Sequence, residues 1–65
     1  MNIAKNLKKY RLKKGWTQEQ LSRKVDVSYN TIIKLETNGI KDPRVSTLKK
    51  ITDILGISID ILVGK

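Results

Sequence analysis

Histidine and cysteine, which supply much of the chemistry of proteins, are both absent from this chain. Imidazole acid–base catalysis, disulfide bonds and thiolate zinc sites are therefore excluded together. The six Asp and Glu residues are scattered along the sequence and form no recognisable pair for acid–base chemistry. We expect no enzymatic activity, no bound metal and no cofactor.

The polar residues whose spacing suits recognition are Asn30 and Lys34. Four positions separate them, so they share one face of a helix. With Ile32 at the centre of the buried side, both lie outward, while Tyr29 lies at the flank and Ile33 nearer the edge. An Asn amide can pair with adenine, a Lys ammonium favours guanine O6 and N7, and apolar atoms can pack on a thymine methyl. This face therefore suits DNA base edges, and the alternative is an ordinary solvated helix surface.

The charge balance also indicates a negatively charged partner. Fourteen Lys and Arg residues against six Asp and Glu residues give a formal net charge of +8, with a pI near 10.1. Such an excess repels itself and is usually retained because a polyanion neutralises it. Nucleic acid and an anionic membrane are the candidate polyanions, and a merely well-solvated surface is the alternative. The lysines near the N-terminus are expected to form a solvated face that adds long-range attraction.

Helices must position these side chains, because apolar residues recur at helical spacing and no segment alternates convincingly with period two. The first helix is expected over residues 2–14, closed by Gly15. Thr17 is a good N-cap for the second, and Gln20 would complete a capping box. Trp16, between them, is expected in the core or at its rim, holding the first helix to the second.

Three further helices are predicted in the second half of the chain. Ser28 would cap the third, which breaks at residues 38–39, an Asn-Gly pair suited to left-handed backbone. Residues 40–44 form a loop, and a fourth helix follows Pro43. Ser58 would cap a short fifth helix. The apolar side chains expected to face inward are Leu21, Val25, Ile32, Leu35, Val45, Leu48, Ile51, Leu55, Ile59 and Leu62.

The second and third helices, with a tight turn at Asp26 and Val27, form a helix-turn-helix over residues 17–37. Two short capped helices joined by such a turn make the unit whose second helix enters a major groove. We predict an all-α fold, a compact five-helix bundle, with residues 1–65 as one domain.

In this pattern the chain resembles the Cro/cI-type (XRE-like) family of phage-repressor helix-turn-helix regulators. The resemblance covers nearly the whole chain, and many residues match in register. They are Leu7, Arg11, Gly15-Trp16-Thr17-Gln18, Leu21, Val27-Ser28, Ile32, Leu35-Glu36, Pro43, Leu48, Leu55-Gly56-Ile57-Ser58 and Leu62.

The resemblance implies roles for residues at matching positions. Arg11 and Glu36 would form a partly buried, structural ion pair. Arg44, which would bind phosphate, could also reach the minor groove. The base contacts would be Tyr29, Asn30, Ile33 and Lys34. The phosphate contacts would be Gln18, Ser28, Thr31, Lys41 and Arg44.

The chain departs from the family pattern at three positions. Ser22 replaces a small Ala, which is close to isosteric. Asp26 stands where the turn usually has Gly, at a cost of about 1 kcal/mol for left-handed backbone. Asp42 adds a negative charge beside the loop that faces phosphate, so fewer contacts are expected there.

The C-terminal segment holds more apolar residues than one short helix can bury. We expect a two-fold dimer interface at Ile57, Ile59, Ile61 and Leu62, and the alternative is a tail packed loosely at the domain edge. A dimer would set two recognition helices about 34 Å apart, one turn of DNA.

Together these features predict a sequence-specific transcriptional regulator of duplex DNA, a repressor in preference to an activator. Its partner would be a pseudo-palindromic operator, bound by a homodimer. The alternatives are a protein-interaction or antitoxin-type module with the same fold, and a cationic membrane-surface peptide. No apolar run approaches the roughly 20 residues that span a bilayer, no secretory signal is recognisable, and we expect a cytoplasmic location.

Overall fold

The computed structural model describes residues 2–64, and every regular element within that range is a helix. The predicted all-α class is confirmed; Met1 and Lys65, the ends of the predicted domain, lie outside the described residues. The elements are α1 (Ile3–Lys13), α2 (Gln18–Val25), α3 (Tyr29–Glu36), α4 (Val45–Leu55) and α5 (Ile59–Val63). None of these helices is long and apolar enough to cross a membrane.

The predicted N-caps are all present. The Thr17 hydroxyl accepts from the amide of Gln20 (3.0 Å), and the Gln20 side-chain oxygen accepts from the amide of Thr17 (2.8 Å). Ser28 accepts from the Thr31 amide, and Ser58 accepts from the Ile61 amide, both at 3.1 Å. Each cap satisfies an amide that has no partner within its helix, so α2, α3 and α5 begin where the sequence places them.

The turn between α2 and α3 is built on left-handed backbone at Asp26 (φ 57°, ψ 46°). The amides of Asp26 and Val27 reach back to the carbonyls of Arg23 and Ser22. The Ser22 side chain is buried, and its hydroxyl donates to the Glu19 carbonyl (2.7 Å). The two family departures in this segment are therefore accommodated, Ser22 by a hydrogen bond and Asp26 by its tolerance of positive φ.

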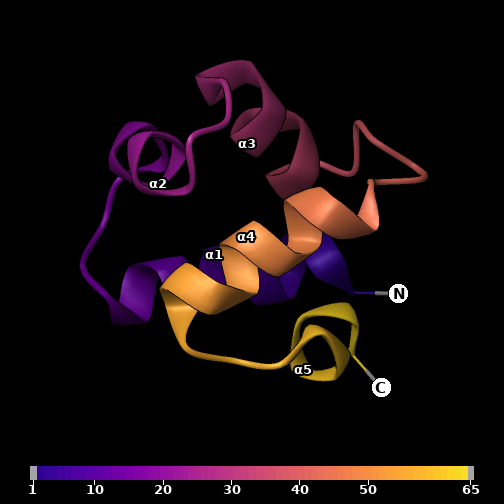
Figure 1. Cartoon of the computed structure of the whole chain (residues 1–65). Helices are drawn as coiled ribbons and strands as arrows, with labels where there is room; N and C mark the ends of the chain where they lie inside the picture. Colours follow the sequence, from indigo (N-terminus) through magenta and orange to yellow (C-terminus); the bar gives the residue numbers. More distant parts are fainter. Residues whose placement is uncertain (1, 65) are drawn as a thin grey trace.

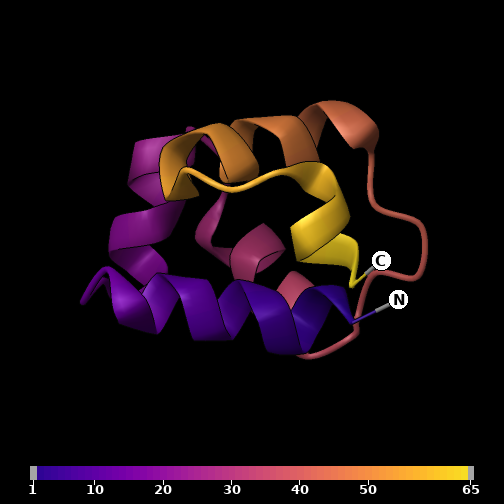
Figure 2. The same cartoon turned by 90° about the horizontal axis from the view of Figure 1, so that it is seen from below.

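One fully buried residue from each helix meets in the core: Leu7, Leu21, Ile32, Ile51 and Leu62. The helices α2 and α3 pack on each other, α3 also packs on α1, and α5 packs on both α1 and α4 (Figure 1). Seen from below, α1 and α4 run along opposite edges of the molecule (Figure 2). Trp16 is half-buried against this core, as expected of a rim residue.

One predicted side-chain position and one predicted interface residue are wrong. Val45 was expected to face inward but is 68% exposed. Helical spacing predicts the direction of a side chain, but it does not predict whether another element lies there to cover it. Leu62 was expected both to face inward and to join a dimer interface. It is 0% exposed within this domain's own core, so the inward position is confirmed and its side chain is not available to a second copy. Ile61 does point outward and is 44% exposed.

Candidate nucleic-acid interface

The outward face of α3 carries the residues predicted to read bases. Asn30 and Lys34 are exposed, Tyr29 at the start of the helix is 47% exposed, and Ile33 is half-buried. On the opposite side of the helix, buried Ile32 and Leu35 anchor it to the core. This arrangement follows from the helical period and leaves a polar strip free on a firmly held helix.

Two hydroxyls predicted to bind phosphate lie together at the start of α3. The Ser28 and Thr31 oxygens are 2.7 Å apart, and either can be the donor. Ser28 is exposed and Thr31 is half-buried. Because the Ser28 hydroxyl also caps the helix, its position is fixed relative to the strip of residues predicted to read bases.

The loop after α3 is held close to the helix end. The Gly39 amide donates to the Lys34 carbonyl (2.7 Å), and Asn38 has left-handed backbone (φ 61°) as predicted. A Cβ at Gly39 would lie 3.3 Å from the Lys34 Cβ, which explains a glycine there. This closure keeps the start of the loop beside Lys34.

The remaining predicted phosphate contacts lie further along this loop. Lys41 and Arg44 are exposed, and so is Asp42 between them. Thr31, Arg44 and half-buried Thr47 help to line a shallow hollow between α3 and the loop. The sequence did not lead us to predict a role for Thr47. Its position three residues after Arg44, the N-cap of α4, could have indicated that its side chain lies near the loop.

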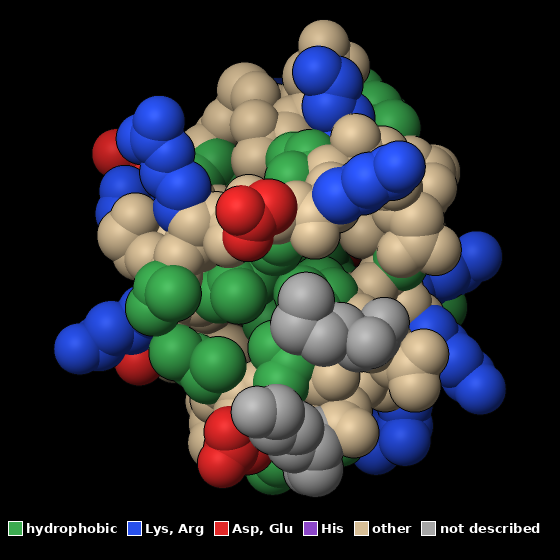
Figure 3. All heavy atoms as spheres, turned by 90° about the vertical axis from the view of Figure 1, so that its right-hand side faces the viewer, with side chains coloured by type: hydrophobic (Ala, Val, Ile, Leu, Met, Phe, Trp, Pro, Cys, Tyr) green, Lys and Arg blue, Asp and Glu red, His purple; other side chains and the backbone are tan. Residues whose placement is uncertain are grey.

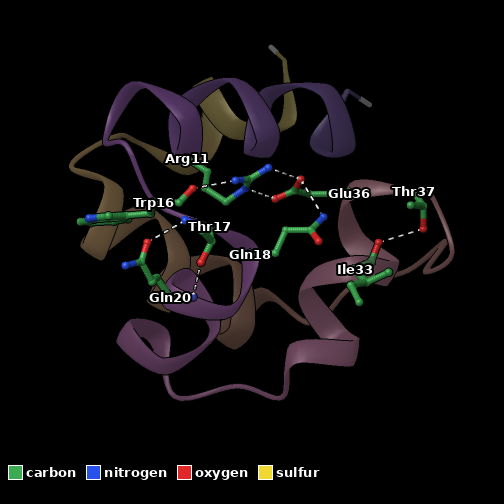
Figure 4. Close-up of polar contacts among 8 residues, drawn as sticks. All are labelled: Arg11, Trp16, Thr17, Gln18, Gln20, Ile33, Glu36 and Thr37. Carbon is green, nitrogen blue, oxygen red and sulfur yellow. Dashed lines mark hydrogen bonds and ion pairs between the residues drawn. The ribbon is translucent and has the colours of Figure 1, made fainter.

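A buried ion pair joins α1 to α3 (Figure 4). Arg11 Nε donates to Glu36 Oε2 (2.7 Å) and Arg11 Nη2 donates to Oε1 (3.1 Å). Arg11 Nη1 also donates to the Trp16 carbonyl (2.6 Å). The two side chains are 8% and 2% exposed, so this is the predicted pair in a more deeply buried form.

Gln18 is held by the same carboxylate. Its Nε2 donates to Glu36 Oε1 (3.2 Å), and its side chain lies between α2 and α3 in Figure 4. Sequence reasoning placed Gln18 at a phosphate but missed this bond, since nothing in a linear sequence indicates a contact between residues 18 positions apart. The second Nε2 hydrogen remains available to another acceptor.

The arrangement suits recognition of a groove. A short anchored helix presents amide, ammonium, phenol and apolar groups on one side, and hydroxyls and cations flank it. A major groove about 12 Å wide admits such a helix. Within residues 2–64, no group of three or more Asp and Glu side chains could hold a metal ion.

The comparison with protein families identifies this arrangement. A family model described as helix-turn-helix matches residues 7–62, nearly the whole chain. The chain belongs to this helix-turn-helix family, of the Cro/cI (XRE-like) type. The predicted family is confirmed.

Three relatives in Bacillus match almost the full chain. The HTH-type transcriptional regulator ImmR of Bacillus subtilis (strain 168) is 34% identical over 65 residues, which are 100% of this chain and 50% of ImmR. The HTH-type transcriptional regulators SinR of Bacillus licheniformis and of Bacillus subtilis (strain 168) are 27% and 28% identical over 97% of this chain. These matches cover 57% of each SinR. The chain therefore spans about half the length of these relatives.

Proposed function

We propose that this domain is a sequence-specific duplex-DNA-binding unit of a transcriptional regulator, a repressor in preference to an activator. The proposal treats residues 1–65 as one domain and residues 17–37 as its DNA-binding motif. The observation that carries it is the outward face of α3, where Asn30 and Lys34 are exposed on a helix anchored by Ile32 and Leu35. Membership of the helix-turn-helix family and the identity of the relatives as HTH-type transcriptional regulators support it.

In this proposal α3 lies in the major groove. Asn30 and Lys34 contact base edges by hydrogen bonds, Tyr29 reaches bases from the N-terminal end, and Ile33 offers apolar contact. Arg44 adds a minor-groove contact beside the helix. The phosphate contacts that fix the register are those of Gln18, Ser28, Thr31, Lys41 and Arg44.

We also propose that two copies pair across the apolar side chains of α5 and of the segment before it. Ile61 is exposed, and Ile57 and Ile59 are half-buried. Figure 3 shows hydrophobic side chains gathered on the side of the molecule where α5 lies in Figure 1. Leu62, which the sequence also placed in this interface, is fully buried and is left out of it. A two-fold pair would read a pseudo-palindromic site.

Selection of bound sites from random duplexes tests the proposal directly. We expect one enriched half-site, repeated with inverted symmetry at about one helical turn. Asn30→Ala and Lys34→Ala should each reduce the preference for this site over random DNA, by about 1–3 kcal/mol per lost base contact. Lys50→Ala, an exposed lysine of α4, is the matched control and should leave the preference unchanged.

A protein-interaction module with this fold is the second candidate, and the exposed apolar residues of α4 and α5 favour it. Sedimentation of the domain alone and with duplex separates the two functions. Salt-sensitive complex formation with duplex supports DNA binding. A domain that shows no affinity for duplex at any salt concentration would support the second candidate.

A further inference from the structure

A row of lysines covers the outer side of α1. Lys5, Lys8, Lys9 and Lys13 are exposed, and Leu12 lies among them at 57% exposure. The opposite side of the helix carries the buried residues, among them Leu7 and Arg11. We call these four lysines the lysine stripe.

The lysine stripe is unfavourable in the isolated domain. Lys5 and Lys9, and again Lys9 and Lys13, are four residues apart on one helix, where like charges destabilise by a few tenths of a kcal/mol. The helix has no acidic residue in its first turn, or anywhere between Ile3 and Lys13. Neither of the two ion pairs within residues 2–64 involves the stripe. A bound polyanion would relieve this repulsion.

Two of these charges lie near the ring of Tyr10. The Nζ atoms of Lys9 and Lys13 lie 5.4 and 5.0 Å from the centre of its ring. Ammonium groups at this distance are attracted to an aromatic face by about 0.5–1 kcal/mol at exposed sites. The ring therefore attracts two ammonium groups of the stripe.

The composition of the stripe favours a phosphate backbone over a protein or a membrane. Protein interfaces are depleted in Lys and enriched in Arg and aromatic residues. A membrane-binding helix needs a broad apolar face, and Leu12 is the only large apolar side chain on the outer side of α1. Lysine ammonium groups act as point charges that require no matched geometry, which suits a row of phosphates.

The stripe faces a different direction from the reading face of α3. Leu7 of α1 and Ile32 of α3 are both fully buried in one core, so the outer sides of the two helices belong to different parts of the surface. Helix α3 lies at the top of the molecule in Figure 1, and α1 forms one edge in Figure 2, which is seen from below. DNA held by α3 therefore leaves the stripe free.

We propose that the lysine stripe is a second, sequence-independent DNA-binding surface, which engages another duplex while α3 holds the first. The inference rests on the DNA binding proposed above. Its consequence is transfer between duplexes without complete release, so dissociation should depend on the concentration of free DNA. With a salt slope of about −0.9 per phosphate contact, four contacts predict that transfer falls about a hundredfold from about 50 to 200 mM salt.

The test follows release of a fluorescent duplex after mixing with increasing concentrations of unlabelled random duplex. For the wild-type chain, the dissociation rate should rise with competitor concentration. The variant K5Q/K9Q should reduce the slope of this rise at least about fivefold, because two of the four phosphate contacts are lost. The control K49Q/K50Q removes the same charge from exposed positions on α4 and should change the slope less than about twofold.

The outcomes distinguish failure of the proposed function from failure of the inference about the lysine stripe. Absence of any complex with the fluorescent duplex contradicts the proposed function itself. A complex whose dissociation is independent of competitor, or equal effects of K5Q/K9Q and K49Q/K50Q, overturns the inference about the stripe alone. Polyglutamate and phosphatidylserine vesicles serve as alternative competitors, and acceleration by either that matches duplex would overturn the assignment to DNA. All four substituted lysines are exposed, so both variants should keep the wild-type circular dichroism spectrum.

Discussion

Gln18, the first residue of α2, donates a hydrogen bond from its side-chain amide to Oε1 of Glu36, the last residue of α3 (3.2 Å). The same carboxylate neutralises Arg11 of α1. One buried side chain therefore ties the residue proposed to bind phosphate to the end of the helix proposed to read bases. Disturbing Glu36 should affect both the fold and the position of Gln18.

Glu36→Ala should strongly destabilise the domain. The substitution leaves Arg11 buried without its counter-ion, and breaking a buried pair in this way costs about 3–5 kcal/mol. At about 0.05–0.15 kcal/mol per residue, this is comparable with the whole free energy of unfolding of a domain of this size. Urea denaturation followed by the fluorescence of Trp16, the only tryptophan, measures the loss.

The paired variant Arg11→Met with Glu36→Met separates charge from packing. Replacing both partners by apolar residues of similar length removes the unpaired charge, so its loss of stability should be smaller than that of Glu36→Ala. A double variant as unstable as Glu36→Ala would mean that the buried charge is not the cause.

Gln18→Ala should weaken DNA binding by about 10- to 150-fold on every sequence. A hydrogen bond to a charged group is worth about 1.5–3 kcal/mol, and a phosphate contact carries no sequence information. Fluorescence anisotropy with the selected duplex and with random duplex measures both affinities.

Gln20→Ala is the control for Gln18→Ala, because it removes the capping box and leaves Gln18 in place. It should lower the free energy of unfolding by about 1 kcal/mol while the folded domain keeps its affinity for DNA. A change in affinity confined to the selected duplex in Gln18→Ala would contradict a phosphate role.

The features that sequence predicted correctly are mainly local ones. Caps such as Thr17 and Ser58, and the left-handed turn at Asp26, depend on residues within a few positions of each other. The contacts it missed join distant parts of the chain. The side-chain amide of Asn6 donates to the carbonyls of Ile61 (3.2 Å) and Leu62 (3.1 Å) and so fastens α5 to α1.

Helical spacing likewise placed the side chains of α3 correctly because buried Ile32 and Leu35 fix its rotation. The same reasoning failed for Val45, the first residue of α4, since periodicity does not show where the core ends. It placed Leu62 inward correctly, and only the assignment of Leu62 to a dimer interface failed. The exposure of side chains at the ends of the chain's later helices therefore required the structure, whereas that of the α3 side chains did not.

Asp26→Gly should stabilise the domain by about 0.5–1 kcal/mol, because glycine adopts positive φ without the penalty that Asp incurs. The midpoint of thermal unfolding should rise by about 2–8 °C for a domain of this size. Asp26→Ala is the control: alanine has no side-chain oxygen to support left-handed backbone, and the midpoint should fall. A lower midpoint in Asp26→Gly would show that the Asp26 side chain contributes more than its backbone costs.

Ile61→Lys should weaken pairing and leave stability nearly unchanged, whereas Leu62→Ala should lower stability and leave the interface atoms in place, although the two residues are adjacent. Ile61 is exposed, so a lysine there should change the free energy of unfolding by no more than about 0.5 kcal/mol, while its charge opposes the contact between two copies. Leu62 is fully buried, and its truncation should cost about 2–5 kcal/mol without directly removing interface atoms. Sedimentation equilibrium on the selected duplex counts the copies bound. Two copies of Ile61→Lys bound as tightly as the wild type would exclude Ile61 from the interface.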